Sequence, residues 1–491
     1  MPSRLPRRRT KILATINPDN ITEAKLESLL QAGMDGTRHN LSHGRVEDHI
    51  RVITMVQALR SPIQPVSIVV DLQGPKLRIL DFKDGKSIKL KANQQFILDA
   101  SCGDNEGTEE RVGLDYKNLI HDVKPGDVLA LADGLLTLVV TEVKDPEIIC
   151  RVETDGVLGG RKGLNKIGGG LSAPALTEKD QEDIAAVVGV RPDYFALSFV
   201  KDADDIRAMR AYLKSIDCHA GIIAKIERRE AINERSILEI TQEADMIMIA
   251  RGDLGVEVGD AHLPGYQKQF IRLARSMNRG VITATQMMES MTTNPIPTRA
   301  EVFDVANAVL DGTDVVMLSG ETAVGRYPVK VVSTMANIVL GAEEEKSSRV
   351  SHHRLETRFR HVEETVAMCA MYAANHHSEG DTQEPTIRAI VCLTETGQTC
   401  VYMSRISSGV SIYALSPNIN TVNKLALYRG VYPAYFETEQ VDHTLIVMDV
   451  MKFLRKNFPL QFAPGDRVLF TKGSKMRRQG GTNMMEIVTM E

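Results

Sequence analysis

The chain contains eight short apolar runs that are rich in β-branched residues and separated by helix-length segments. Such runs are typical of parallel strands that are buried on both faces. Eight of them in one chain predict an α/β fold built on a (β/α)₈ barrel. The runs are Lys11–Ile16, Thr37–Leu41, Val66–Leu72, Asp193–Phe199, Gly221–Ile226, Asp245–Ala250, Gly280–Ala284 and Asp314–Leu318.

Each run ends at or beside a polar or charged residue, and most of these residues are of types that bind phosphate, metal or carboxylate. In a (β/α)₈ barrel the carboxyl ends of the strands meet at one mouth, where the reacting groups lie. The pattern therefore predicts an enzyme. The residues at these ends include Thr15, Arg38, Asn40, Ser42, Asp71, Lys225, Glu227, Asp253, Thr285, Ser319 and Glu321.

The chain has 491 residues, too many for one barrel of about 250 residues, so we expect three domains. Short alternating runs punctuated by Gly and Pro predict an inserted small β-barrel domain at residues 72–169, placed over the barrel mouth as a lid. The catalytic barrel itself is expected at residues 1–71 and 170–345. Alternating strand and helix candidates then predict an open α/β domain at residues 346–491.

Composition narrows the possible partners. The hydrophobic fraction is 43%, the charged fraction 25% and the formal net charge −5, which is typical of a soluble globular protein without a large nucleic-acid surface. The first nine residues are basic, but no apolar segment of signal or membrane-spanning length follows them. We therefore expect a cytoplasmic protein that binds small molecules rather than nucleic acid or membrane.

Six motifs carry a family resemblance. They are RHNLSHG (38–44), DLQGPKLR (71–78), ARGDLG (250–255), ATQMMESM (284–291), PTRAE (297–301) and SGETA (319–323). With them, the chain resembles a pyruvate kinase along nearly its whole length. The resemblance implies Mg²⁺-dependent phosphoryl transfer from phosphoenolpyruvate to ADP, which gives pyruvate and ATP in the last step of glycolysis, and a homotetramer.

The residues themselves agree with a metal-assisted transfer. Glu227 and Asp253 follow neighbouring predicted strands and offer two hard oxygen ligands, which suits Mg²⁺ (or Mn²⁺) that keeps waters and contacts substrate. Strand alternation places Lys225 on the same face as Glu227. The resemblance implies that Lys225 lies beside the transferred phosphoryl group, where an ammonium can neutralise developing charge.

The resemblance also assigns the groups that hold the substrates. Gly252, Asp253 and Thr285 would bind the phosphoenolpyruvate carboxylate, and Arg38 its phosphoryl group. Thr285, Ser319 and Glu321 would hold or relay the proton that converts the enolate to pyruvate. The nucleotide positions are Thr15, Pro18, Asn40, His43, Arg78 and Lys162.

A monovalent-cation site is also implied. Asn40, Ser42, Asp71 and the carbonyl of Leu72 match the oxygen cage that holds K⁺ in the family. Lys76, however, stands where many relatives carry a glutamate and depend on K⁺. It resembles the bacterial-type members in which an ammonium replaces the ion, so we predict activity without K⁺.

The chain departs from the family pattern on the nucleotide side and at one position of a loop in the third domain. Asn17, Asp48 and Val324 differ on the nucleotide side, which predicts altered nucleotide affinity or preference. In the third domain, a loop resembles the one that holds an effector's phosphate in family members, so a sugar phosphate or AMP is the expected effector. Its residues are Thr394, Thr396, Gly397 and Thr399, and Gln398 stands where some members have arginine.

Two alternative functions remain open at this point. The first is a Mg²⁺-dependent aldolase that acts on pyruvate enolate on a similar barrel. The second is a catalytically silent family member that senses ligands and regulates. The inserted lid with Lys162 argues against the aldolase, and the presence of Lys225, Glu227, Asp253 and Thr285 argues against the silent member.

Overall fold

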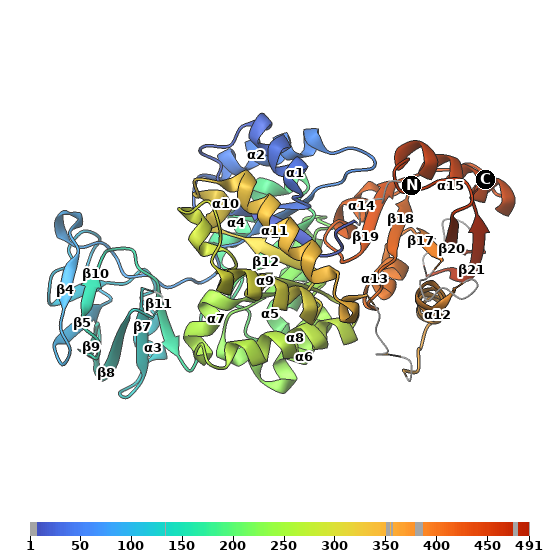
Figure 1. Ribbon diagram of the computed structural model, residues 1–491. Coiled ribbons are helices and arrows are strands. Elements are labelled where there is room, and N and C mark those ends of the chain that lie inside the picture. Colours follow the sequence, from blue (N-terminus) through green and yellow to red (C-terminus); the bar gives the residue numbers. More distant parts are fainter. Residues whose placement is uncertain are drawn as a thin grey trace.

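The computed structural model describes residues 7–132, 134–349, 354, 357–378, 386–474 and 480–490. The first six residues, part of the basic start of the chain, lie outside this description. Figure 1 shows a central barrel with a β-rich body on one side, drawn in cyan, and an α/β body on the other, drawn in orange to red. These are the three parts that the sequence predicts.

The central part is a closed barrel of eight parallel strands in the order β1-β16-β15-β14-β13-β12-β3-β2. Every predicted run forms one of these strands. Their bounds are β1 (Lys11–Thr15), β2 (Gly36–Asn40), β3 (Ser67–Asp71), β12 (Tyr194–Leu197), β13 (Gly221–Ile226), β14 (Met246–Ala250), β15 (Gly280–Ala284) and β16 (Val315–Leu318).

Burial explains why these strands are apolar along their whole length. In β1, Ile12 and Ala14 pack into the cluster between strands and helices, while Leu13 packs into the barrel interior. Both faces are therefore covered, as expected for a parallel sheet surrounded by helices. The surrounding helices are α1 (Glu23–Ala32), α2 (Val46–Leu59), α4 (Glu178–Val187), α5 (Ala203–Ser215), α6 (Glu234–Glu243), α7 (Arg251–Val258), α8 (Leu263–Ser276), α9 (Arg299–Asp311), α10 (Gly320–Ala323) and α11 (Pro328–Glu343).

One family motif has a direct structural role. Thr298 in PTRAE is the N-cap of α9, and its hydroxyl accepts a hydrogen bond from the Glu301 backbone N–H at 3.3 Å. The Glu301 carboxylate accepts the Thr298 backbone N–H at 2.8 Å in return. This capping box satisfies two N–H groups that a helix start would otherwise leave unpaired.

The insertion between β3 and β12 has its own core around Phe96, Leu129 and Leu138. It holds a six-stranded sheet in the order β11-β7-β8-β9-β5-β6 and a two-stranded pair, β10-β4. Strands β6, β10 and β11 were not predicted. The bounds are β4 (Ile88–Leu90), β5 (Gln95–Asp99), β6 (Arg111–Gly113), α3 (Leu119–Asp122), β7 (Val128–Leu131), β8 (Leu136–Lys144), β9 (Glu147–Val152), β10 (Gly156–Leu158) and β11 (Leu164–Ile167).

The C-terminal part is an open five-stranded sheet in the order β19-β18-β17-β20-β21. Four strands are parallel and only the β20–β21 pair is antiparallel, as expected for strands that alternate with helices in the predicted open α/β domain. Its elements are α12 (Val362–His376), β17 (Ile387–Leu393), α13 (Gln398–Ser404), β18 (Ser411–Ser416), α14 (Ile419–Leu425), β19 (Val431–Tyr435), α15 (His443–Asn457), β20 (Arg467–Gly473) and β21 (Thr482–Thr489). The exact domain boundaries stay predictions.

None of the helices in the described residues is both long and apolar enough to cross a membrane.

Candidate active site

A polar cavity of about 120 Å³ lies at the carboxyl ends of the barrel strands. It brings together ten of the residues that the sequence predicts, from five separate stretches of the chain. They are Arg38, Asn40, Ser42, His43, Lys76, Arg78, Lys225, Glu227, Asp253 and Thr285.

Lys225 stands at the centre of the cavity's charges. Its ammonium lies 3.0 Å from a Glu227 carboxylate oxygen and 3.2 Å from Oδ1 of Asp71. Burial lowers the pKa of Lys225, but the negative charges of Asp71 and Glu227 outweigh burial and raise it above its ordinary value. The ammonium is therefore held charged, as a group that neutralises phosphoryl charge must be.

Arg38 is fixed by the same carboxylate from the other side. Its Nε donates to Oδ2 of Asp71 at 2.6 Å, and its Nη1 donates to the Thr15 hydroxyl at 3.0 Å. Burial raises the pKa of Asp71, but the positive charges of Arg38 and Lys225 outweigh burial and bring this pKa below its ordinary value. One ionised aspartate thus orients two cations toward the cavity.

Glu227 and Asp253 offer a place for a divalent cation. The Glu227 carboxylate is buried and accepts the Phe199 backbone N–H at 2.7 Å. Burial and the charge of Asp253 raise the pKa of Glu227, against the opposing effect of Lys225. A cation between the two carboxylates would remove this repulsion, so the residues fit Mg²⁺. The described residues contain no group of three or more His, Cys, Asp or Glu side chains arranged for a metal.

Thr285 is held in a strained conformation at the end of β15. It has φ +67°, which is costly for a β-branched residue, and Gln286 after it has φ +51°. The Thr285 hydroxyl accepts the Gly252 backbone N–H at 2.8 Å and donates to the Ala284 carbonyl at 2.6 Å. This ties the Gly252–Asp253 turn at the start of α7 to Thr285.

Matches to models of known protein families show which family the chain belongs to. A family model described as "Pyruvate kinase, barrel domain" matches residues 7–332, and one described as "Pyruvate kinase, alpha/beta domain" matches residues 364–488. The chain belongs to the pyruvate kinase family.

Individual relatives agree over the full length. The chain is 48% identical to pyruvate kinase II of Salmonella typhimurium and 47% identical to the pyruvate kinase of Haemophilus influenzae, in each case over 99% of both chains. Among solved structures, a pyruvate kinase from Cryptosporidium parvum superposes with a TM-score of 0.86 at 30% identity, covering 99% of this chain and 96% of that one.

Sequence reasoning missed one residue of this pyruvate kinase site, Ser198. It is 1% exposed and lies just after β12, and its hydroxyl is 2.7 Å from the Lys225 ammonium and donates to the Leu72 carbonyl at 2.7 Å. It is the polar residue near the end of a predicted run, so the rule that selected the other strand ends could have found it.

The predicted monovalent-cation positions lie close together but are partly engaged. The Leu72 carbonyl accepts the Ser198 hydroxyl, and Oδ1 of Asn40 accepts the Ser42 backbone N–H at 3.2 Å. The Lys76 ammonium enters the cavity 3.3 Å from Oδ1 of Asp253. A positive charge is therefore present beside one of the two predicted metal-binding carboxylates.

Ser319 and Glu321 do not line the cavity. The Glu321 carboxylate accepts the backbone N–H groups of Ser319 at 2.7 Å and Met288 at 3.1 Å. The Ser319 hydroxyl is buried without a hydrogen-bond partner among the described residues. In this arrangement the Glu321 carboxylate holds the loop after β16 through backbone hydrogen bonds. Of the two residues, Ser319 is the one whose side chain makes no such bond within the described residues.

The nucleotide-side residues are less gathered. Arg78 lines the cavity and its Nη1 donates to the Arg161 carbonyl at 3.2 Å, whereas Lys162 is exposed in the insertion and neither it nor Pro18 lines the cavity. Burial, and then the charges of Arg78 and Arg38, lower the pKa of His43.

The three departures from the family pattern are local. Asp48 pairs with Arg45 at 3.0 Å, Oδ1 of Asn17 accepts the Asp19 backbone N–H at 3.0 Å, and Val324 is 68% exposed.

The predicted effector loop lies beside a separate small cavity of about 60 Å³ in the C-terminal part. Gly397 takes φ +83°, and its N–H donates to the Thr394 hydroxyl at 2.9 Å. The Thr399 hydroxyl pairs with that of Thr482 at 2.9 Å, and Thr396 lines the cavity. Three carboxylates, those of Glu363, Glu395 and Glu437, also line it.

Proposed function

We propose that this pyruvate kinase transfers the phosphoryl group of phosphoenolpyruvate to ADP in the cavity around Lys225. The observation that carries the proposal is the convergence of Lys225, Arg38, Glu227 and Asp253 on one polar cavity at the barrel mouth. Two cations and two carboxylates around one cavity suit a reaction that positions a phosphoryl group and neutralises its charge.

Each cation has its own task in this proposal. Arg38, held by Asp71 and Thr15, presents its remaining N–H groups to the phosphoryl oxygens. Lys225 neutralises charge on the phosphoryl group and on the enolate oxygen that it leaves. Arg78, His43 and Lys162 bind the nucleotide phosphates, and Lys162 reaches them when the insertion moves toward the barrel.

Glu227 and Asp253 would hold Mg²⁺ or Mn²⁺, which supplies Lewis-acid stabilisation of the phosphoryl oxygens when bound. The Gly252 turn and Thr285 orient the carboxylate of the substrate through backbone N–H and hydroxyl groups. The enolate is then protonated at carbon. Thr285 borders the cavity, and the Ser319 hydroxyl has no hydrogen-bond partner in the described part of the chain, which supports a role for these two residues in holding the proton, with Glu321 positioning Ser319.

We propose further that the enzyme needs no K⁺, because Lys76 lines the same cavity as Asn40 and Ser42 and its ammonium lies 3.3 Å from Oδ1 of Asp253. The loop at Thr394–Thr399 is proposed to bind a sugar phosphate or AMP. A homotetramer is proposed from the family resemblance, and exposed apolar side chains on α15 and β21, such as Leu445, Met448 and Ile487, offer a surface for it.

The direct test is pyruvate formation from phosphoenolpyruvate and ADP with Mg²⁺. Lys225→Met removes the charge and keeps the length of the side chain, and we expect turnover to fall on the order of 10³-fold. Circular dichroism would confirm that the variant is folded. If the parent enzyme shows no turnover with any cation or effector, the catalytically silent, ligand-sensing alternative is favoured. If the variant keeps its turnover, Lys225 has no essential role in the mechanism.

A further inference from the structure

A second polar cavity, of about 230 Å³, lies where the barrel meets the C-terminal sheet. It is at the amino ends of the barrel strands, because Arg9 lines it just before β1, while the active site lies at the carboxyl ends. Its barrel side is lined by the segment before β1, by the end of α11 and by Arg349, which follows the turn η5 (Lys346–Ser348). Its C-terminal side is lined by strands β17 and β18 and by the segment after α15. None of these residues takes part in the proposed reaction.

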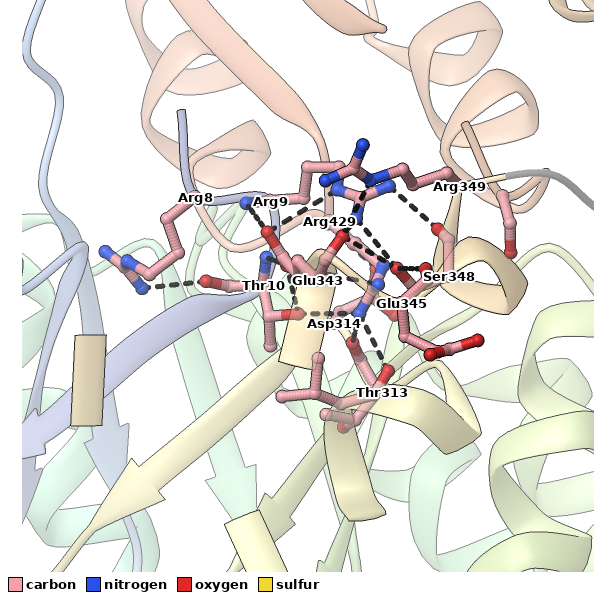
Figure 2. A network of polar contacts seen from close by, with 12 residues as sticks. Arg8, Arg9, Thr10, Thr313, Asp314, Glu343, Glu345, Ser348, Arg349 and Arg429 are labelled. Atoms are coloured by element: carbon pink, nitrogen blue, oxygen red, sulfur yellow. Dashed lines mark hydrogen bonds and ion pairs between the residues drawn. The ribbon is translucent and has the colours of Figure 1, made fainter. Parts of the chain in front are cut away.

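The floor of this cavity is a fixed network, shown in Figure 2. The Arg9 guanidinium donates to the Ser348 carbonyl at 2.7 Å and to the Glu343 carbonyl at 2.9 Å. The Glu343 carboxylate accepts the backbone N–H groups of Arg9 at 2.8 Å and Thr10 at 2.7 Å. Both side chains are at least nine-tenths buried, so the cavity is built on an ordered base rather than on loose surface chains.

The charges around the cavity do not cancel. Arg9 and Glu343 form an ion pair at 3.4 Å and neutralise each other. The remaining charged groups of the lining are Arg7, Arg349 and Arg388 against the single carboxylate of Glu344. Three positive charges and one negative charge leave an excess of +2, which matches a dianion.

The three remaining guanidinium groups keep donors available. Arg349 uses its Nε on the Glu343 carbonyl at 3.1 Å, and Arg388 uses its Nε on the Gln461 carbonyl at 3.0 Å. Among the described residues, the terminal N–H₂ groups of both make no hydrogen bond. Arg7 stacks on the Tyr432 ring at 4.3 Å, and its hydrogen bond within the described part of the chain is a long one, 3.3 Å to the Tyr413 hydroxyl. Guanidinium forks of this kind match phosphate oxygens in pairs.

The cavity beside the effector loop differs in charge. Its described lining has three glutamates and neither Lys nor Arg.

We propose that this seam cavity binds a small phosphate monoester as its dianion, with Arg349 and Arg388 as the main phosphate ligands. Its volume exceeds the space that phosphate alone needs, and Tyr413 and Gln461 border it as partners for the hydroxyls of the ester. Since Arg349 follows the barrel and Arg388 belongs to the C-terminal sheet, the bound ester bridges the two parts.

The absence of tryptophan from the chain allows a site-specific test. Phe462→Trp places the only indole in the cavity wall, and Leu340→Trp is a second reporter should the first disturb the core. Each reporter is titrated with glycerol phosphate and with inorganic phosphate, against chloride at equal ionic strength. We expect a saturable fluorescence change with glycerol phosphate, and at least a tenfold weaker apparent affinity when Arg388→Gln is added.

Thr396→Ala at the effector loop is the matched control and should leave the titration unchanged. No saturable change in either reporter would overturn the proposal, as would a change that survives Arg388→Gln or disappears in Thr396→Ala. A response to inorganic phosphate but not to glycerol phosphate would overturn the assignment to an ester.

Discussion

The hydroxyl of Ser198 lies 2.7 Å from the ammonium of Lys225 while it donates its own proton to the Leu72 carbonyl. One side chain therefore connects Lys225, the cation proposed to neutralise the phosphoryl group, to the strand end from which the inserted domain departs. Among the described residues, the Ser198 hydroxyl hydrogen-bonds to the Leu72 carbonyl and the Lys225 ammonium alone, so its effect should be seen chiefly in catalysis.

We expect Ser198→Ala to lower kcat about tenfold, because one buried hydrogen bond to a charged group contributes about 1.5 kcal/mol. Ser198→Thr keeps the hydroxyl and should recover much of the loss. Steady-state kinetics would separate kcat from KM, with Ser276→Ala on the exposed side of α8 as control. Equal kcat in Ser198→Ala and the parent would show that Lys225 needs no such support.

The position of Lys76 beside Asp253 predicts how the enzyme responds to monovalent cations. Turnover of the parent should be the same in Na⁺, K⁺ and organic-cation buffers, since the ammonium supplies the charge. Lys76→Glu should lower turnover in Na⁺ by at least tenfold and restore it in K⁺. Strong K⁺ stimulation of the parent would contradict the prediction.

Glu257 should make stability depend on pH. Burial, and then the charge of Glu230, raise its pKa from 4.5 to about 7, and its buried Oε2 finds no hydrogen-bond partner among the residues that the structure describes. A pKa that is higher in the folded chain stabilises the fold fully below about pH 4.5, and this stabilisation is lost as pH rises through about 7. The difference corresponds to about 3 kcal/mol.

Urea unfolding of Glu257→Gln would test this. The variant should match the parent near pH 4.5 and exceed it above pH 7, where the parent carries a buried charge. Glu182→Gln, at an exposed position on α4, should follow the parent throughout. Parallel pH curves for Glu257→Gln and the parent would contradict a raised pKa.

The Arg405–Asp314 pair joins the C-terminal part to the start of β16. Both side chains are 1% exposed, and Nη1 of Arg405 donates to Oδ2 of Asp314 at 2.9 Å. Arg405→Leu should lower the free energy of unfolding by about 3 kcal/mol, because it leaves a buried carboxylate without its cation. Arg235→Ala, which breaks an exposed pair on α6, should change it by less than about 0.5 kcal/mol. A small effect of Arg405→Leu would mean that Arg429 and the backbone donors suffice for Asp314.

Much of the architecture could be read from local pattern. Strand β1 is apolar at successive residues, from Ile12 to Ala14, because both of its faces are covered. Such an unbroken apolar run is visible in the sequence. The strands β6, β10, β11, β19 and β21 were missed. The first four have three to five residues, which leaves little periodic signal, and β21 is exposed at most of its positions.

The sequence by itself determined the barrel, its eight strand ends and the residue types that gather there, because strand period and family motifs are properties of neighbouring residues. Only the tertiary structure decided which of those groups meet. It placed Ser198 against Lys225, turned Glu321 toward backbone N–H groups rather than the cavity, and brought Arg9, Arg349 and Arg388 together at the seam. Such contacts join residues up to hundreds of positions apart in the chain. They form only when the elements pack against one another, and no pattern of neighbouring residues encodes that packing.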